Sequence, residues 1–176
     1  MTEAKSTQHE SPIARLAQII ARKQHFRGDA AALDNGEQAA LARLDPESPR
    51  PHQVGALARA LVLAGIAPDD WLPETWQRWA LLAHGMAVAG HDVSARLGAQ
   101  LARAEVSESR VTRLLTARGD AFRQQIPRLL RLMASRGVAP NWLELGALIL
   151  ATDRDDADAE RWRLRIAGNY FSVAHR

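Results

Sequence analysis

The chain contains no cysteine, which excludes disulfide bonds, thiol nucleophiles and thiolate metal sites and is compatible with a reducing compartment. Long hydrophobic runs are also missing, since no window approaches the roughly 18 uninterrupted apolar residues of a membrane span. Residues 1–12 lack the apolar core of a signal peptide. With 176 residues, the chain is long enough to bury a core without disulfides or metal. We therefore predict a soluble, cytoplasmic protein with no membrane partner.

Strand patterns are absent too, because no segment alternates Val, Ile and Thr with polar residues. Apolar residues instead recur at i, i+3, i+4 and i+7, the spacing of an amphipathic helix. The sequence predicts an all-α fold, a compact helical bundle of about eight or nine helices. Residues 11–104 and 105–176 either form two packed helical subdomains, with a seam near residues 103–108, or one continuous domain.

Known catalytic patterns are missing: there is no Walker loop, dinucleotide-binding glycine fingerprint, HExxH or EF-hand loop. His84 and His91 are seven residues apart, but Gly85 and Gly90 interrupt the helix between them, which disfavours a shared metal. The aspartates of residues 153–158 invite a divalent-metal nuclease hypothesis, yet acids at the start of a solvated helix are the better interpretation. We predict no enzyme, no cofactor and no metal site.

Lysine is scarce, with two residues against 21 arginines, and the basic charge is unevenly placed. Residues 1–109 carry a net charge of −2 and residues 110–176 a net charge of +5. A GC-rich genome accounts for arginine in place of lysine, so the clustering is more informative than the total. Within residues 107–137, the part from Arg110 to Arg136 holds seven arginines and one acid, Asp120.

Within residues 107–137, apolar side chains repeat at helical spacing in two runs, one beginning at Val111 and one at Ile126. Ser107 is typical of a helix start, Gly119 of a break, Pro127 of a first turn or a kink, and Gly137 of a stop. At about 100° per residue, one set of arginines lies away from the apolar stripes. This set comprises Arg110, Arg113, Arg128 and Arg131. Planar guanidinium groups favour phosphate or carboxylate contacts, and phosphate is the first hypothesis.

Three tryptophans lie within nine residues, at Trp71, Trp76 and Trp79. An aromatic stripe at helical spacing is more often core than a stacking platform for bases, so we predict core packing here. Further helices are expected over residues 12–24, 30–33, 37–44, 52–64, 93–103, 142–151 and 161–171, with another starting at Asp70 or Pro73. Acids in the first turn of the last helix would complement its dipole.

Several segments resemble a known family in order and spacing. SESRVTRLL, then IPRLLRLMASRGVAPNW, then RWRLRIAGNYF, look like the C-terminal half of the small subunit of the type I-E CRISPR Cascade complex, the CasB family. GEQAALARLDP loosely resembles an arginine-containing segment of its N-terminal half, although Gln38 and Ala42 stand where arginines are usual. The resemblance covers residues 11–45 loosely and residues 107–172 better.

The resemblance implies a non-catalytic, all-helical subunit of a crRNA-guided antiviral surveillance complex, present as a pair. Expected partners are the target DNA and displaced strand of an R-loop, other Cascade subunits and a second copy of the chain. The candidate phosphate contacts are Arg27, Arg43, Arg110, Arg113, Arg128, Arg131, Arg161 and Arg165. The alternative is a helical adaptor that binds only protein, with its arginines against acidic partners.

Overall fold

The computed structural model describes residues 10–21 and 32–175. These residues form nine helices and no strand, which confirms the predicted all-α bundle. The helices are α1 (Pro12–Ala21), α2 (Asn35–Ala42), α3 (Pro51–Leu63), α4 (Pro73–Ala89), α5 (Leu97–Arg103), α6 (Glu108–Thr116), α7 (Gly119–Ser135), α8 (Trp142–Ala151) and α9 (Asp156–Ala174).

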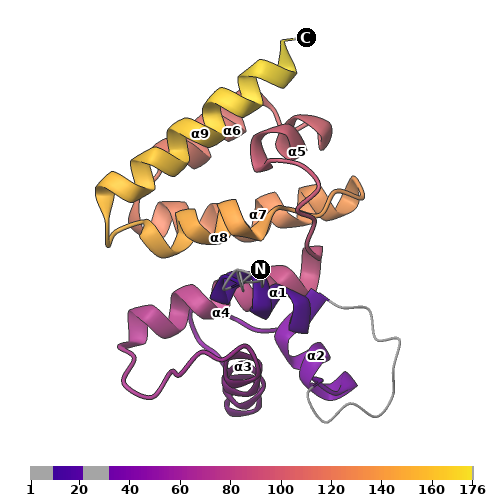
Figure 1. Ribbon diagram of the computed structural model, residues 1–176, viewed down its shortest axis with the longest axis vertical. Coiled ribbons are helices and arrows are strands. Elements are labelled where there is room, and N and C mark those ends of the chain that lie inside the picture. Colours follow the sequence, from indigo (N-terminus) through magenta and orange to yellow (C-terminus); the bar gives the residue numbers. More distant parts are fainter. Residues whose placement is uncertain (1–9, 22–31, 176) are drawn as a thin grey trace, which may run out of the picture.

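The helices lie in tiers (Figure 1). Helices α7 and α8 cross the middle of the molecule, with α9, α6 and α5 on one side and α1 to α4 on the other. Helix α8 packs on α9 in one direction and on α1 and α4 in the other, while α7 packs on α4. The central tier is therefore covered on both sides, and α8 is among the most apolar helices, with Trp142, Leu145 and Leu148 fully buried.

Local sequence signals explain several helix starts. Asp34 accepts a hydrogen bond from the backbone N–H of Glu37 at 2.7 Å, and Glu37 accepts one from the Asp34 N–H at 2.9 Å, so each caps the other at the start of α2. Asn141 caps α8 by accepting from the Leu143 N–H at 3.0 Å. Asp155 caps α9 by accepting from the Asp158 N–H at 2.9 Å. The cap at Asn141 and the acids in the first turn of α9 match the predictions.

The two apolar runs of the arginine-rich stretch form the buried faces of α6 and α7. Val111 and Leu114 are buried on α6, and Phe122, Ile126, Leu129, Leu130 and Met133 are buried on α7. The stretch ends as predicted at Gly137, where φ is 67° and the N–H of Val138 donates to the Met133 carbonyl at 2.9 Å. One face of each helix is thus fixed in the core and the opposite face is left to its charged side chains.

Some element boundaries differ from the predictions. Helix α9 begins at Asp156, five residues earlier than predicted, because Asp155 caps it and its acids suit the positive end of the helix dipole. Helix α5 is shorter than expected and starts at Leu97. Pro127 lies inside α7, which excludes a first turn and leaves the other expected role, a kink, as a prediction. Of the helix predicted over residues 30–33, residues 30 and 31 lie outside the described part, and Ala32 and Leu33 are not helical.

The tryptophan cluster is only partly in the core. Trp79 is 8% exposed, which confirms core packing for that residue, whereas Trp71 and Trp76 are half-buried. The division into residues 11–104 and 105–176 stays a prediction. Helix α5 precedes that boundary in the sequence, yet it packs on α9, which follows the boundary. Over the described residues, none of the helices combines the length and hydrophobicity needed to span a bilayer.

Candidate nucleic-acid interface

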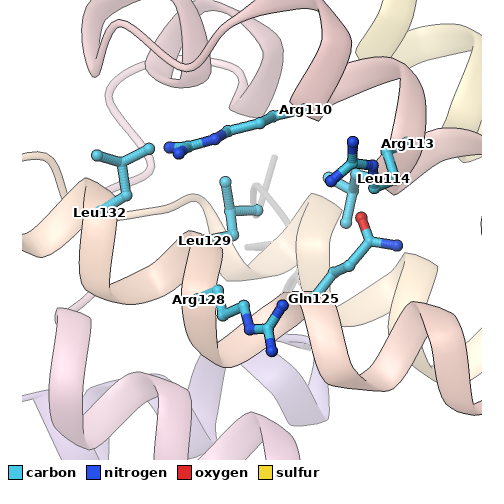
Figure 2. A pocket seen from close by; sticks show the side chains of 7 residues that line it. All are labelled: Arg110, Arg113, Leu114, Gln125, Arg128, Leu129 and Leu132. Carbon is cyan, nitrogen blue, oxygen red and sulfur yellow. The ribbon is translucent and has the colours of Figure 1, made fainter.

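The exposed faces of α6 and α7 meet in a groove of about 280 Å³ (Figure 2). Helix α6 contributes Arg110 and Arg113, and α7 contributes Arg128 and Gln125 from the opposite side. Arg110, Arg113 and Arg128 are all exposed, so the helical spacing predicted the direction of all three. The groove therefore has guanidinium groups on both walls.

Between those walls the groove is apolar. Leu114, Leu129 and Leu132 line it, and Figure 2 shows Leu129 between the two helices. Leu114 is 2% exposed and Leu129 8% exposed, so their side chains belong mainly to the core. No carboxylate lines this groove among the residues that the structure describes. The arrangement suits a ligand whose anionic groups reach the arginines on the walls and whose less polar part lies against the leucines between them.

The other arginines of the stretch are held in ion pairs. Arg118 pairs with Glu160 at 3.6 Å, and Arg136 pairs with Glu105 at 2.7 Å. Arg123 contacts Glu47 at 3.5 Å and also pairs with Asp120. Three of the seven arginines thus have their charge offset within the molecule.

The remaining four have no such partner in the part of the chain that the structure describes. None of Arg110, Arg113, Arg128 and Arg131 makes an ion pair or a side-chain hydrogen bond with any described residue. All four are exposed. We call these four residues the cationic face. Because no carboxylate of the described residues neutralises them, their donors are available to an external anion.

Arg128 and Arg131 also line a second hollow, of about 310 Å³, between α7, α4 and residues 45–47. Asp45, Glu47 and Arg123 line the same hollow. Its charges are mixed, in contrast to the groove between α6 and α7. Arg128 lies on the border of both, so the cationic face is continuous across α7, and acids flank it on the α4 side.

Arg161 and Arg165 lie apart from that groove. They line a separate hollow of about 450 Å³ on α9 together with Trp162 and Asp158. Arg161 pairs with Asp158 at 2.6 Å, and the Arg165 guanidinium lies 5.3 Å from the centroid of the Trp162 ring. Stacking of this kind leaves the edge donors of Arg165 free to bind a phosphate.

Of the N-terminal candidates, Arg43 is not among the residues that line these hollows. Arg43 is exposed at the end of α2, where its carbonyl accepts from Gln53 Nε2 at 2.8 Å, and its guanidinium has no ion-pair partner within the described residues. Arg27 lies outside the residues that the structure describes.

Two groups of lining residues were not predicted. Gln125 and the leucines of the groove carry no signal of a binding site in the sequence, since the leucines are indistinguishable from other core positions. Asp45 and Glu47 lie in the proline-rich loop, about 80 residues before Arg128, so only the tertiary fold brings them near it.

The residues weighed for metal binding have other roles. His84 Nδ1 lies 3.1 Å from the Leu41 carbonyl oxygen, and His91 Nδ1 accepts from the Trp142 N–H at 3.3 Å. Asp155 caps α9 and Asp158 pairs with Arg161. Over the described part of the chain, no group of three or more His, Asp or Glu residues is placed to hold a metal ion.

The fold and the groove together define an all-helical protein with an unpaired cationic surface. The model of the family described as CRISPR-associated protein Cse2 matches residues 37–171. The chain belongs to this family, and it is therefore a small subunit of a type I-E CRISPR Cascade complex. No curated protein and no solved structure matches the chain.

Proposed function

We propose that the chain is a non-catalytic structural subunit that binds nucleic-acid backbone through the cationic face and so stabilises the R-loop of its complex. The observation that carries this proposal is the division of the arginines in residues 107–137. Arg118, Arg123 and Arg136 are paired with acids, whereas Arg110, Arg113, Arg128 and Arg131 lie at the surface without a partner among the described residues. Family membership supports the setting of a Cascade complex.

The mechanism is electrostatic. Guanidinium groups that contact phosphates release condensed counterions, which favours binding without recognition of sequence. Exchange of a DNA duplex for a guide–target heteroduplex is nearly balanced in free energy, so a few backbone contacts to either separated strand shift the equilibrium. The cationic face would then act as a clamp on the target strand or the displaced strand. Arg43, Arg161 and Arg165 are further candidate contacts, as is Arg27.

The proposed partners are nucleic acid, the other Cascade subunits and a second copy of the chain. A net charge of +3 is modest, so the isolated chain should bind weakly. Much of the effective affinity should come from the assembly, which holds the chain beside the strand. This is why binding should be measured both for the isolated protein and for the complex.

The test compares two double variants that remove the same charge. Arg110→Ala with Arg128→Ala removes two unpaired arginines, and Arg118→Ala with Arg136→Ala removes two that are held in ion pairs. We expect the first variant to weaken binding to single-stranded DNA by about tenfold or more at low salt, and the second to have a much smaller effect. Equal effects of the two variants on the dissociation constant would contradict the assignment.

The alternative function, an adaptor that binds only protein, draws support from exposed apolar side chains. Leu72 is 69% exposed, Leu164 65% and Val62 62%. Purification of the assembled complex separates the two functions. An adaptor predicts that the Arg110→Ala, Arg128→Ala variant enters the complex poorly, while the proposed function predicts normal assembly with weaker retention of target DNA.

A further inference from the structure

The tryptophan cluster places one indole at the surface on a rigid support. Trp71 stacks on Trp79 with ring centroids 5.6 Å apart and an interplanar angle of 18°, and Trp76 meets Trp71 edge-on at 5.6 Å. Trp79 is 8% exposed and belongs to the core, whereas Trp71 is half-buried. Trp71 is therefore held in place by two neighbouring indole rings.

Trp71 lines a hollow of about 560 Å³ between the start of α4 and the turn from α8 to α9. Leu72 lies beside it and is 69% exposed. Two arginines from different elements also line the hollow, Arg78 from α4 and Arg154 from the turn. An indole, an exposed aliphatic side chain and two guanidinium groups thus share one depression.

Neither arginine makes an ion pair or a side-chain hydrogen bond with a described residue. Burial and the nearby charge of Arg154 lower the pKa of Arg78 below its ordinary value, and Arg123 acts in the same direction. The carboxylates of Asp153 and Glu74 oppose this effect without cancelling it. A bound anion would relieve the repulsion between the two arginines.

The negative charge of each of the two acids that line the hollow is offset by the start of a helix. Glu74 lies in the first turn of α4. Asp153 accepts a hydrogen bond at 3.3 Å from the N–H of Gly119, the first residue of α7. Backbone N–H groups at a helix start offset negative charge, so these carboxylates repel an incoming anion less than their number suggests.

This hollow is connected to the cationic face by charged residues. Arg128 is common to the groove between α6 and α7 and to the hollow that also contains Arg131 and Arg123. Arg123 in turn acts on Arg78 through its charge. Arg123 thus links the surroundings of Arg78 to the hollow that Arg128 lines.

We propose that the hollow formed by Trp71, Leu72, Arg78 and Arg154 binds one nucleotide of an unpaired strand, with the base against Trp71 and Leu72 and the phosphate on the two arginines. A stacked base is available only from an unpaired strand, because the faces of paired bases are covered by their neighbours in a duplex. The site therefore distinguishes separated strands from duplex DNA. This inference rests on the proposed function and adds a contact to bases, which the cationic face does not make.

The experiment compares binding of an oligothymidylate with binding of an abasic oligomer that has the same number of phosphates. We expect wild-type protein to prefer the base-bearing strand by about fivefold, the effect of one stacked base. Trp71→Ala should abolish this preference and Trp71→Phe should retain most of it. Arg103→Ala serves as a control, since Arg103 is exposed on α5 and paired with Asp92. A Trp71→Ala protein that keeps the wild-type preference would overturn the inference.

Two substitutions at Leu72 test the same site without the risk that the protein fails to fold. Leu72 occupies the cap position of α4 without a side-chain hydrogen bond, so Leu72→Asp should improve the cap and keep or raise the thermal stability. Its added negative charge should nevertheless weaken oligothymidylate binding severalfold, and uncharged Leu72→Asn should weaken it less. Equal binding by wild type, Leu72→Asp and Leu72→Asn would contradict the site.

The outcomes separate this inference from the proposed function. If Arg110→Ala with Arg128→Ala weakens binding and the Trp71 and Leu72 variants do not, the nucleotide site is wrong and the clamp stands. If the Trp71 and Leu72 variants reduce only assembly with the other subunits, the hollow binds protein and the inference fails. If all variants bind DNA as wild type does, both proposals fail.

Discussion

At the scale of single residues, the function of each arginine is decided by its neighbours. Arg118 and Arg128 lie in the same stretch and both reach the surface, yet the first pairs with Glu160 and the second lacks a carboxylate partner within the described residues. An exposed ion pair contributes about 0–1 kcal/mol to stability. The unpaired arginines therefore add little to the fold, and their clustering is better explained by an external ligand.

Among the described glycines, Gly98 leaves the least space between the position of a Cβ and the backbone of another helix. A Cβ at this position would lie 2.5 Å from both the Ile166 carbonyl oxygen and the Tyr170 nitrogen of α9. Backbone atoms cannot turn aside as a flexible side chain can, so Gly98→Ala should separate α5 from α9. We expect a loss of about 1–3 kcal/mol in the free energy of unfolding, measured by urea denaturation.

Gly55 is the matched control for this substitution. It also lies in a helix, α3, but a Cβ there would meet nothing within 4 Å. Gly55→Ala should therefore raise the free energy of unfolding by up to about 1 kcal/mol, through helix propensity alone. A Gly98→Ala protein as stable as Gly55→Ala would show that α5 does not pack closely on α9.

The sequence predicted which way the arginine side chains point, but not which of them form ion pairs. The 3.6-residue repeat places Arg110 and Arg128 away from the apolar stripes, and neither is buried. The partners of Arg118, Arg123 and Arg136 include Glu160, Glu47 and Glu105, which are at least 31 residues away in the chain. No local pattern encodes such pairs, so the division into paired and unpaired arginines required the tertiary structure.

At the scale of elements, the start of α8 organises the segment between α4 and α5. The N–H of Asn141 donates to Gln100 Oε1 at 2.6 Å, and Asn141 Nδ2 donates to the Ala95 carbonyl at 3.0 Å. Glu144 Oε2 accepts from the Leu97 N–H at 2.7 Å. Residues 90–96 thus form an ordered connection, although they are not helical.

His91 makes this connection sensitive to pH. Burial lowers its pKa, and the hydrogen bond to the Pro140 carbonyl and the charge of Asp92 offset this only in part. The neutral ring accepts from the Trp142 N–H at 3.3 Å, an interaction that protonation of Nδ1 would remove. Because the pKa is lower in the folded state, the unfolded state binds the proton first.

The stabilising contribution of neutral His91 should therefore be complete above its unfolded pKa of about 6.5, and should decline as the pH falls from that value through the folded pKa. Urea denaturation on both sides of this range should show lower stability at the acid end. His91→Gln should flatten this part of the profile. An unchanged pH dependence in His91→Gln would rule out the residue as its source.

Helix ends with strong local signals were predictable, and those that depend on partners were not. Asn141 and Gly137 fixed their boundaries through a side-chain cap and a positive φ, both readable from residue type. Helix α5 starts late because Glu144 holds the Leu97 N–H, an interaction across 47 residues. Pro127 is tolerated inside α7 because Ile126, Leu129 and Leu130 bury the helix on both sides of it.

At the scale of the whole molecule, the core tier and the cationic face are built from the same helices. Helix α7 buries one face against α4 and carries Arg128 and Arg131 at the surface. A rigid support keeps the guanidinium groups at a fixed spacing, which favours a regularly charged ligand over a single anion. This is the property that the proposed function requires of the cationic face.

The salt dependence of binding tests the central claim most directly. Affinity for single-stranded DNA should fall with salt, and the slope of log K against log salt should reflect the number of phosphates neutralised. Replacing Arg110, Arg113, Arg128 and Arg131 by Ala should make that slope shallower by about 3, at roughly 0.7 for each phosphate that is no longer neutralised. A quadruple variant that keeps the wild-type slope would contradict the assignment of these four arginines to the nucleic-acid backbone.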